Sequence, residues 1–366
     1  MNKEVTFRQI GFMYIFITIS PILRQIPNAV ASEAGKNGYF STLLSLLVIM
    51  PLTGIIIALL KVFPGFNLYE IMVHTLGKFV AKCIIFIYFL WILFTLVTKV
   101  SIYSSSLQAT LMPYTKTNFF LVSMILLVCY ALQKGMKTVF RISEFTLVPI
   151  LLLLAVLIIC AIPRIRIDYL QPVSTINVRP TINAAKNVVA IGGYIILTLF
   201  FSDKFRLNLT KQHINKLWFS IGGFTAIAFL ITATTIGING AKLTARLPYP
   251  FFVAVKNISI LNAFERFEAF ITLICLLSDF VMICIFAIIL IRCLQWIFDL
   301  DHMGFLYVPI IMLVYYLTFY LSSTQFELEY LYKNIMVNAN IVFQYVIPLV
   351  LALVCLMKKK RVQKQY

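Results

Sequence analysis

The sequence predicts an all-helical (all-α) integral membrane protein of about ten transmembrane helices. Of its 366 residues, 61% are hydrophobic and only 12% are charged, whereas soluble domains are about half apolar and a quarter charged. A helix needs about 20 apolar residues to cross the hydrocarbon layer of a bilayer, and stretches of that length recur between short polar joints. The lipid bilayer is therefore the expected solvent for most of this chain.

Ten apolar stretches supply the predicted helices. In order, they cover residues 8–32, 39–61, 79–111, 118–133, 143–162, 182–201, 216–238, 266–298, 305–322 and 336–357. The N-terminal sequence MNKEVTFRQIG runs straight into the first stretch with no small-residue cleavage site, so this helix is expected to be retained. Placing both termini in the cytoplasm puts more lysines and arginines in the inner segments than in the outer ones, as the positive-inside rule favours.

The ten helices divide into two halves of five, which predicts an inverted repeat within a single transmembrane domain, residues 1–366. Repeat one is expected at about 8–162 and repeat two at about 182–357. With an odd number of helices in each half, the second half enters the membrane upside down relative to the first, as in many transporters. The first and sixth helices then correspond, and both carry residues that weaken a helix.

In the first helix, Pro21 and Pro27 each remove a backbone donor and crowd the carbonyl four residues earlier. The hydroxyl of Ser20 can bond a freed backbone group. We therefore expect this helix to break near residues 20–23. The alternative is an ordinary proline kink without a binding role.

In the sixth helix, Gly192 and Gly193 are adjacent, and each lowers helix propensity by about 1 kcal/mol relative to alanine. A broken helix is tolerated in a membrane only where it is buried in protein or lines a cavity. The pairing of the two weak points in equivalent helices predicts a binding site between them. The alternative is that the glycines serve close helix packing.

Three charged residues fall inside predicted helices, where an unpaired charge costs several kcal/mol. They are Arg24, Lys99 and Asp279. One acid among two bases predicts that Asp279 neutralises Arg24 or Lys99, and that the charged groups of a ligand compete for or extend this network. Thr95 shares a helix face with Lys99, since the two are four residues apart. A purely structural ion pair is the alternative.

An α-amino acid suits this arrangement. Its carboxylate would meet the free amides after the first break, where the N-terminus of a half-helix carries partial positive charge. Its ammonium would meet carbonyls near Gly192. The residues do not define the side chain of the ligand.

Nothing in the sequence predicts an enzyme, a cofactor or a metal site. The seven cysteines lie in apolar segments without a CxxC pair, and the three histidines have no ligand-spaced partners. The chain has no GxxxxGK[ST], GxGxxG, GxSxG or HExxH motif. The formal net charge is +18, but the basic residues are scattered at helix ends, so nucleic acid is not an expected partner.

Several strings resemble those of the spore germination permeases, the B subunits of endospore germinant receptors, within the amino acid/polyamine/organocation transporter superfamily. The resemblance extends over nearly the whole chain. The strings are IPNAVASEAGKNGYFSTLL, LYEIMVHTLGK, GMKTVFRISEFTLVPILLL, LQPV and FERFEAF.

This resemblance implies a LeuT-like fold with five-plus-five inverted repeats, and a small-molecule germinant pocket between the first, third, sixth and eighth helices. It also implies partners, namely a larger membrane A subunit and a lipoprotein C subunit, in the inner membrane of a dormant spore. The subunit would sense a germinant, with an amino acid as the expected class, and trigger germination.

Carried onto this chain, the pocket of the family, together with the charged residues above, gives a set of expected ligand-binding residues. They are Ser20, Pro21, Ile22, Arg24, Thr95, Lys99, Ile191, Gly192, Gly193, Asp279 and Met282. Amino-acid-sensing relatives often have a glycine-containing stretch where this chain has Ser20-Pro21-Ile22, which leaves the ligand open. Two other functions remain: a secondary amino-acid or cation symporter that uses Asp279 as the coupled acid, and a structural or channel-forming partner with a vestigial pocket.

Overall fold

The computed structural model describes residues 6–171, 178–204, 210–256, 267–300, 304–321, 327 and 330–363. Helices make up every regular element in these ranges. The first part of the chain forms α1 (Phe7–Arg24), α2 (Ile26–Ala34), α3 (Gly38–Leu44), α4 (Leu46–Val62), α5 (Leu68–Leu76), α6 (Lys78–Thr110), α7 (Thr117–Gln133) and α8 (Met136–Ala161). The predicted all-helical class is confirmed over the described residues.

The second part begins with α9 (Val178–Gly192), which continues directly into the 3₁₀ helix η5 (Gly193–Lys204). The following helices are α10 (Lys211–Asn239), α11 (Ala241–Arg246), α12 (Pro250–Lys256), α13 (Glu268–Phe298) and α14 (Tyr307–Leu321). The C-terminal helix contains the π-helical turn η7 (Leu331–Met336), α16 (Val337–Ile341), a second π-helical turn η8 (Val342–Val346) and α17 (Ile347–Gln363).

Seven helical segments of the described chain are long and apolar enough to cross a membrane. Two shorter apolar helices, Thr117–Gln133 and Gly304–Tyr320, together with α1, occupy the remaining predicted ranges. All ten predicted ranges are therefore helical over their described residues. By length and composition, seven segments of the described chain are candidate membrane spans, and both the ten crossings and the inverted repeat stay predictions.

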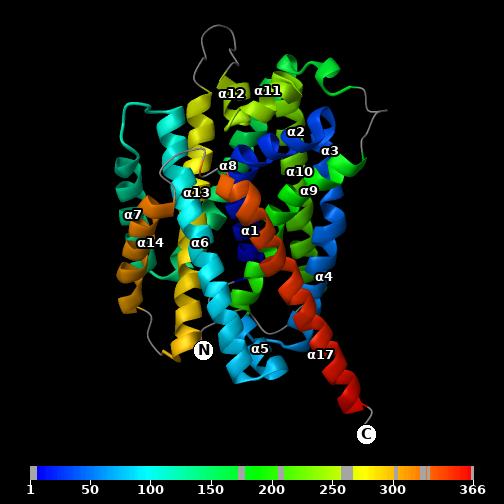
Figure 1. Ribbon diagram of the computed structural model, residues 1–366, viewed down its shortest axis with the longest axis vertical. Helices are drawn as coiled ribbons and strands as arrows, with labels where there is room; N and C mark the ends of the chain where they lie inside the picture. The colour runs from blue at the N-terminus through cyan, green and yellow to red at the C-terminus, as the bar shows by residue number, and fades with distance from the viewer. Residues whose placement is uncertain are drawn as a thin grey trace.

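Helix α1 lies at the centre of the bundle, between two groups of helices (Figure 1). It packs against α10 on one side and against α13 and α8 on the other. The second group of contacts continues from α13 to α6 and α7, and the first continues from α10 to α3 and α4. Almost every side chain of α1 is buried, as expected of a helix enclosed by protein rather than by lipid.

The interruption of the first helix lies at Gln25 rather than near residues 20–23, which corrects the prediction. Helix α1 continues through Ser20, Pro21 and Ile22 to Arg24, and α2 begins at Ile26. The physical reason is that Pro27 has no N–H to bond the carbonyl of Leu23, so the ladder fails one turn later than expected. Pro27 itself is well placed in the first turn of α2, where its missing donor costs nothing.

The sixth predicted helix changes at the expected glycine pair. The α-helical ladder ends at Gly192, and the 12-residue 3₁₀ helix starts at Gly193. Runs of 3₁₀ helix longer than 3–4 residues are uncommon and often mark strain or a hinge. All but the last two residues of this 3₁₀ run are buried, so the surrounding helices hold it in place.

Candidate functional site

A buried ion pair joins the end of α1 to the middle of α13. The Arg24 guanidinium donates to the Asp279 carboxylate and, at 3.2 Å, to the hydroxyl of Ser20 one turn earlier. Arg24 is 7% exposed and Asp279 is 1% exposed. Arg24 stands in the last turn of α1, where the negative end of the helix dipole stabilises a cation. Of the two bases that sequence offers for Asp279, the structure therefore pairs it with Arg24.

Ser278, the neighbour of Asp279, inserts its hydroxyl into the backbone ladder of α1. It accepts a hydrogen bond from the Ser20 N–H at 3.0 Å and donates to the Phe16 carbonyl at 2.7 Å. In an uninterrupted helix these two backbone groups bond each other. The Ser278 hydroxyl therefore attaches α13 to the backbone of α1 one residue before Pro21, while α1 itself continues to Arg24.

Lys99 connects α6 to the interruption in α1. Its ammonium donates to the side-chain oxygen of Gln25 at 3.1 Å and lies 6.0 Å from the centre of the Tyr194 ring. Lys99 is 2% exposed, and a desolvated cation beside an aromatic face gains stabilisation. The interrupted α1, the long helix α6 and the start of η5 therefore meet at Lys99.

Thr95, the expected neutral neighbour of Lys99 on α6, is buried and has its hydroxyl bonded within its own helix. Its hydroxyl donates to the Trp91 carbonyl of its own helix at 2.8 Å, as a hydroxyl inside a helix commonly does. The remaining expected residues Pro21, Ile22, Ile191 and Met282 are buried hydrophobic or imino residues. Their contribution to the site is shape rather than charge.

The glycine pair is packed against neighbouring helices. A Cβ at Gly192 would lie 2.3 Å from the Ile49 side chain, and one at Gly193 would lie 2.0 Å from the Gln344 amide oxygen. Only residues without a side chain allow this approach. The geometry favours the close-packing alternative for both glycines.

The carbonyls at the end of α9 are already bonded by side chains from other helices. Tyr345 donates to the Val189 carbonyl and Tyr14 to the Gly192 carbonyl, both at 2.9 Å. Asn340 donates to the carbonyl of Ala190 at 3.2 Å. These carbonyls lie in the last turn of α9, where it passes into η5. A ligand ammonium at this point would have to displace one of these donors.

Beside this junction, Gln344 is fully buried, and neither its amide oxygen nor its amide nitrogen has a hydrogen-bond partner among the described residues. It lies in the π-helical turn η8, a type of turn that is frequent at functional sites. Such an unsatisfied amide requires a water, a ligand or a conformational explanation.

The space beside the ion pair is small. A void of about 20 Å³ borders Arg24, Cys275 and Tyr249. A void of this size holds about one water molecule and is too small for an amino acid. A ligand that reaches Arg24 from this side therefore requires the helices around the pair to separate.

Comparison with known proteins assigns the chain to a family. A family model described as "Spore germination protein" matches residues 4–327. The chain belongs to this family of spore permeases. It is 23% identical over 379 residues to "Spore germination protein KB" of Bacillus subtilis (strain 168), and the alignment covers 99% of this chain and 97% of that protein.

The spore permease carries a second, partly buried ion pair that sequence reasoning does not single out. Arg292 of α13 contacts Asp203 of η5 at 2.6 Å and donates to the Phe200 carbonyl. Its guanidinium also lies 5.4 Å from the centre of the Phe201 ring. Asp279 and Arg292 thus attach one helix, α13, to both interrupted helices of the spore permease.

Other residues of the site also escape prediction. Gln25, Ser278, Tyr194 and Asn340 are uncharged, so the cost of a charge in a membrane does not mark them. Of these four residues, only Ser278 could have been suspected from the sequence, because it directly precedes the intramembrane Asp279.

Proposed function

We propose that this spore permease is the germinant-sensing membrane subunit of a spore germinant receptor, with a small molecule of the amino-acid class as its ligand. Family membership and the name of the Bacillus subtilis relative support a role in spore germination. The observation that carries the proposal is the buried Arg24–Asp279 pair at the interruption of α1. Intramembrane charges of this kind mark ligand or ion sites.

The pair offers complementary charges to a zwitterion. The carboxylate of an amino acid can bond Arg24 or Lys99, and its ammonium can bond Asp279. One intramolecular ion pair is then exchanged for ion pairs to the ligand. After this exchange, Arg24 and Asp279 each still face an opposite charge. An uncharged ligand that separated them would leave both without one.

Binding by this exchange requires motion, because the void beside Arg24 is about 20 Å³. The Arg24–Asp279 pair and the bond from Ser20 to Ser278 hold α1 against α13. A ligand that binds the separated arrangement better shifts the population toward it. A change in the position of α1 would be the signal passed to the rest of the receptor.

The proposed receptor places this subunit in the spore inner membrane, with both termini on the spore-core side. Its proposed partners are a larger membrane A subunit and a lipoprotein C subunit, as the family resemblance implies. The start of α1 and the end of α17 lie at the same end of the bundle (Figure 1), which suits a pair of termini on one side.

The test is the germination of spores that carry Lys99→Met, followed as the fall in optical density against a panel of amino acids. The matched control is Lys137→Met, an exposed lysine near the start of α8. Loss of response to a germinant that the wild type detects, at equal subunit levels, supports the proposal. An unchanged response in Lys99→Met would remove this cluster from ligand recognition.

A symporter would behave differently. Concentrative amino-acid uptake by the purified chain in vesicles, abolished by Asp279→Asn, would favour transport over sensing. Gly192→Trp is a poorer probe of the site, since Gly192 packs against Ile49 and Phe224 and a large side chain there disturbs the bundle itself.

A further inference from the structure

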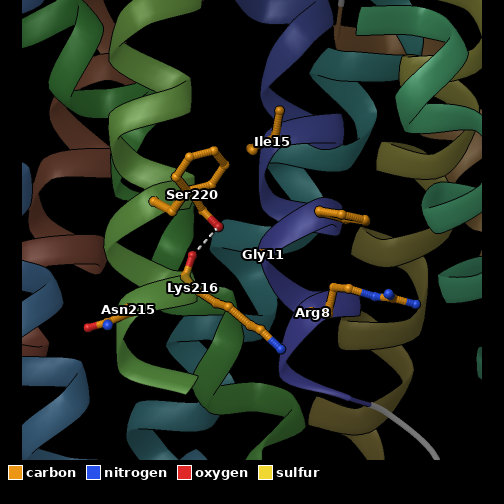
Figure 2. Close-up of a pocket in the computed structure, with 8 residues that line it drawn as sticks. Arg8, Gly11, Ile15, Asn215, Lys216 and Ser220 are labelled. Atoms are coloured by element: carbon orange, nitrogen blue, oxygen red, sulfur yellow. Dashed lines mark hydrogen bonds between the residues drawn. The ribbon is translucent and has the colours of Figure 1, made fainter. Parts of the chain in front are cut away.

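A groove lies between the first turns of α1 and α10, away from the Arg24–Asp279 pair. Its volume is about 280 Å³. Figure 2 shows it between the two helices, with side chains of both along its walls. The residues that form it include Gly11, Phe12 and Ile15 of α1, and Lys216, Phe219 and Ser220 of α10.

The groove is apolar because of how the two helices meet. A Cβ at Gly11 would lie 2.4 Å from the hydroxyl oxygen of Ser220, so the missing side chain lets the backbones approach. The Ser220 hydroxyl donates to the Lys216 carbonyl of its own helix at 2.8 Å, which satisfies it internally. Apolar side chains therefore form the walls of the groove, and one of them, Phe219, is 77% exposed.

Of the two cations that line the groove, Lys216 has no ion pair within the described ranges of the chain. Arg8 is engaged by the carboxylate of Glu144 on α8, and Figure 2 shows its side chain projecting away from Lys216. The Lys216 side chain extends from α10 toward α1, and its ammonium has no ion pair among the residues that the structure describes. The groove therefore combines an apolar wall with a single available positive charge.

This combination occurs at one end of the bundle, where α1 and α10 begin. The exposed, apolar Phe219 lies close to the polar first turn of α10. In a bilayer, such a junction of apolar and polar surface is expected at the boundary between hydrocarbon and headgroups. Basic pockets between transmembrane helices at this boundary bind the headgroups of anionic lipids. An isolated anion would gain nothing from the apolar wall.

We infer that the groove binds an anionic phospholipid, whose phosphate contacts Lys216 and whose acyl chain lies along Ile15 and Phe219. The contribution of a single lysine near a membrane surface corresponds to a preference of about fivefold for an anionic over a zwitterionic lipid. The site is independent of the germinant proposal, because neither Lys216 nor the groove contacts the Arg24–Asp279 pair.

The test uses fluorescence quenching by brominated lipids in vesicles that contain the full-length protein. The reporter is Phe219→Trp in a Trp218→Phe background, because the other two tryptophans, Trp91 and Trp296, are 4% and 8% exposed. Brominated phosphatidylglycerol and brominated phosphatidylcholine are compared at equal mole fractions. Equal thermal unfolding temperatures verify that each variant is folded.

We expect phosphatidylglycerol to occupy the groove about five times more readily than phosphatidylcholine. Lys216→Gln should abolish this preference, while Lys61→Gln, an exposed lysine in the last turn of α4, should retain it. Equal quenching by both lipids in the reporter protein would overturn the inference. An equal loss in the Lys61→Gln control would do so too, because it would assign the effect to the overall surface charge.

Discussion

Ser278 of α13 accepts a hydrogen bond at 3.0 Å from the backbone amide of Ser20 in α1. The same hydroxyl donates to the Phe16 carbonyl at 2.7 Å, so a side chain of one helix completes the backbone ladder of another. The adjacent residue, Asp279, pairs with Arg24 one turn further along α1. Two successive residues of α13 thus hold the C-terminal part of α1.

Removal of this bridge should loosen the contact between α1 and α13. We expect Ser278→Ala to lower the free energy of unfolding by about 1 kcal/mol, since two buried hydrogen bonds are lost and the backbone of α1 can only partly re-form its own bond. Thermal unfolding in detergent measures this. Ser143→Ala is the matched control, because that buried hydroxyl bonds only its own helix, at the Phe140 carbonyl. Equal effects of the two substitutions would contradict a bridging role.

Breaking the buried ion pair should cost more. Asp279→Asn and Arg24→Gln should each destabilise the protein by about 3–5 kcal/mol, because each leaves a buried charge uncompensated. The double variant should cost less than the sum of the two, since both charges are then gone. Additive effects in this double-mutant cycle would show that the two residues do not interact.

The charge swap separates structure from recognition. Arg24→Asp combined with Asp279→Arg keeps a pair but reverses its direction between α1 and α13. If a zwitterionic ligand bonds these charges, we expect the swap to restore thermal stability but not the germination response. Restoration of both stability and response would assign the pair a structural role only.

The glycine at the start of η5 should be sensitive to a single methyl group. Gly193→Ala is expected to destabilise the protein by about 1–3 kcal/mol, because the new Cβ would lie 2.0 Å from the Gln344 amide oxygen and 2.6 Å from the Tyr345 ring. Gly222→Ala in α10 is the control, as no atom lies within 4 Å of its Cβ position. It should be neutral or stabilising by up to about 1 kcal/mol. A tolerated alanine at both positions would argue against close packing at η5.

The pH dependence of stability should include a contribution from Asp299 at the end of α13. Hydrogen bonds from Lys82 at 2.8 Å and from Lys78 at 3.3 Å hold the pKa of this carboxyl below its usual value. Its folded-state pKa is then below the unfolded value of about 3.9. The stabilisation is present above that unfolded value and is lost as the pH falls through the folded pKa.

Asp299→Asn tests this contribution, and asparagine suits the left-handed backbone at this position, where φ is 52°. The variant should unfold at a slightly lower temperature than the wild type at pH 7, with a difference that shrinks below about pH 4 and in high salt. A difference that is independent of pH would show that the carboxylate charge does not contribute.

Much of the fold follows from patterns that sequence makes visible. The apolar stretches predict the helical ranges, since a polar backbone in lipid has to bond within its own helix. The glycine pair marks the change from α9 to η5, and Asp279 and Arg24 stand out because charges are rare in such segments. These signals are local, and a local signal can be read without knowing the neighbours.

The position of the first interruption depends on more than local signals. Pro21 and Pro27 both weaken the helix, and sequence reasoning assigns the break to the first of them. In the structure, α1 continues through Pro21 to Arg24 and the interruption lies at Gln25, while the Ser278 hydroxyl of α13 bonds the backbone near Pro21. A helix contact from a residue about 260 positions away along the chain gives no sign in the neighbourhood of the proline.

Sequence by itself determined that this chain is helical, that it belongs in a membrane, and which three charges had to find partners inside it. Only the tertiary structure decided that Asp279 pairs with Arg24, that Lys99 turns to Gln25, and that the carbonyls at the end of α9 are already bonded. The reason is physical. Hydrophobicity and charge belong to a single residue, whereas its hydrogen-bond partner depends on which helices pack against it.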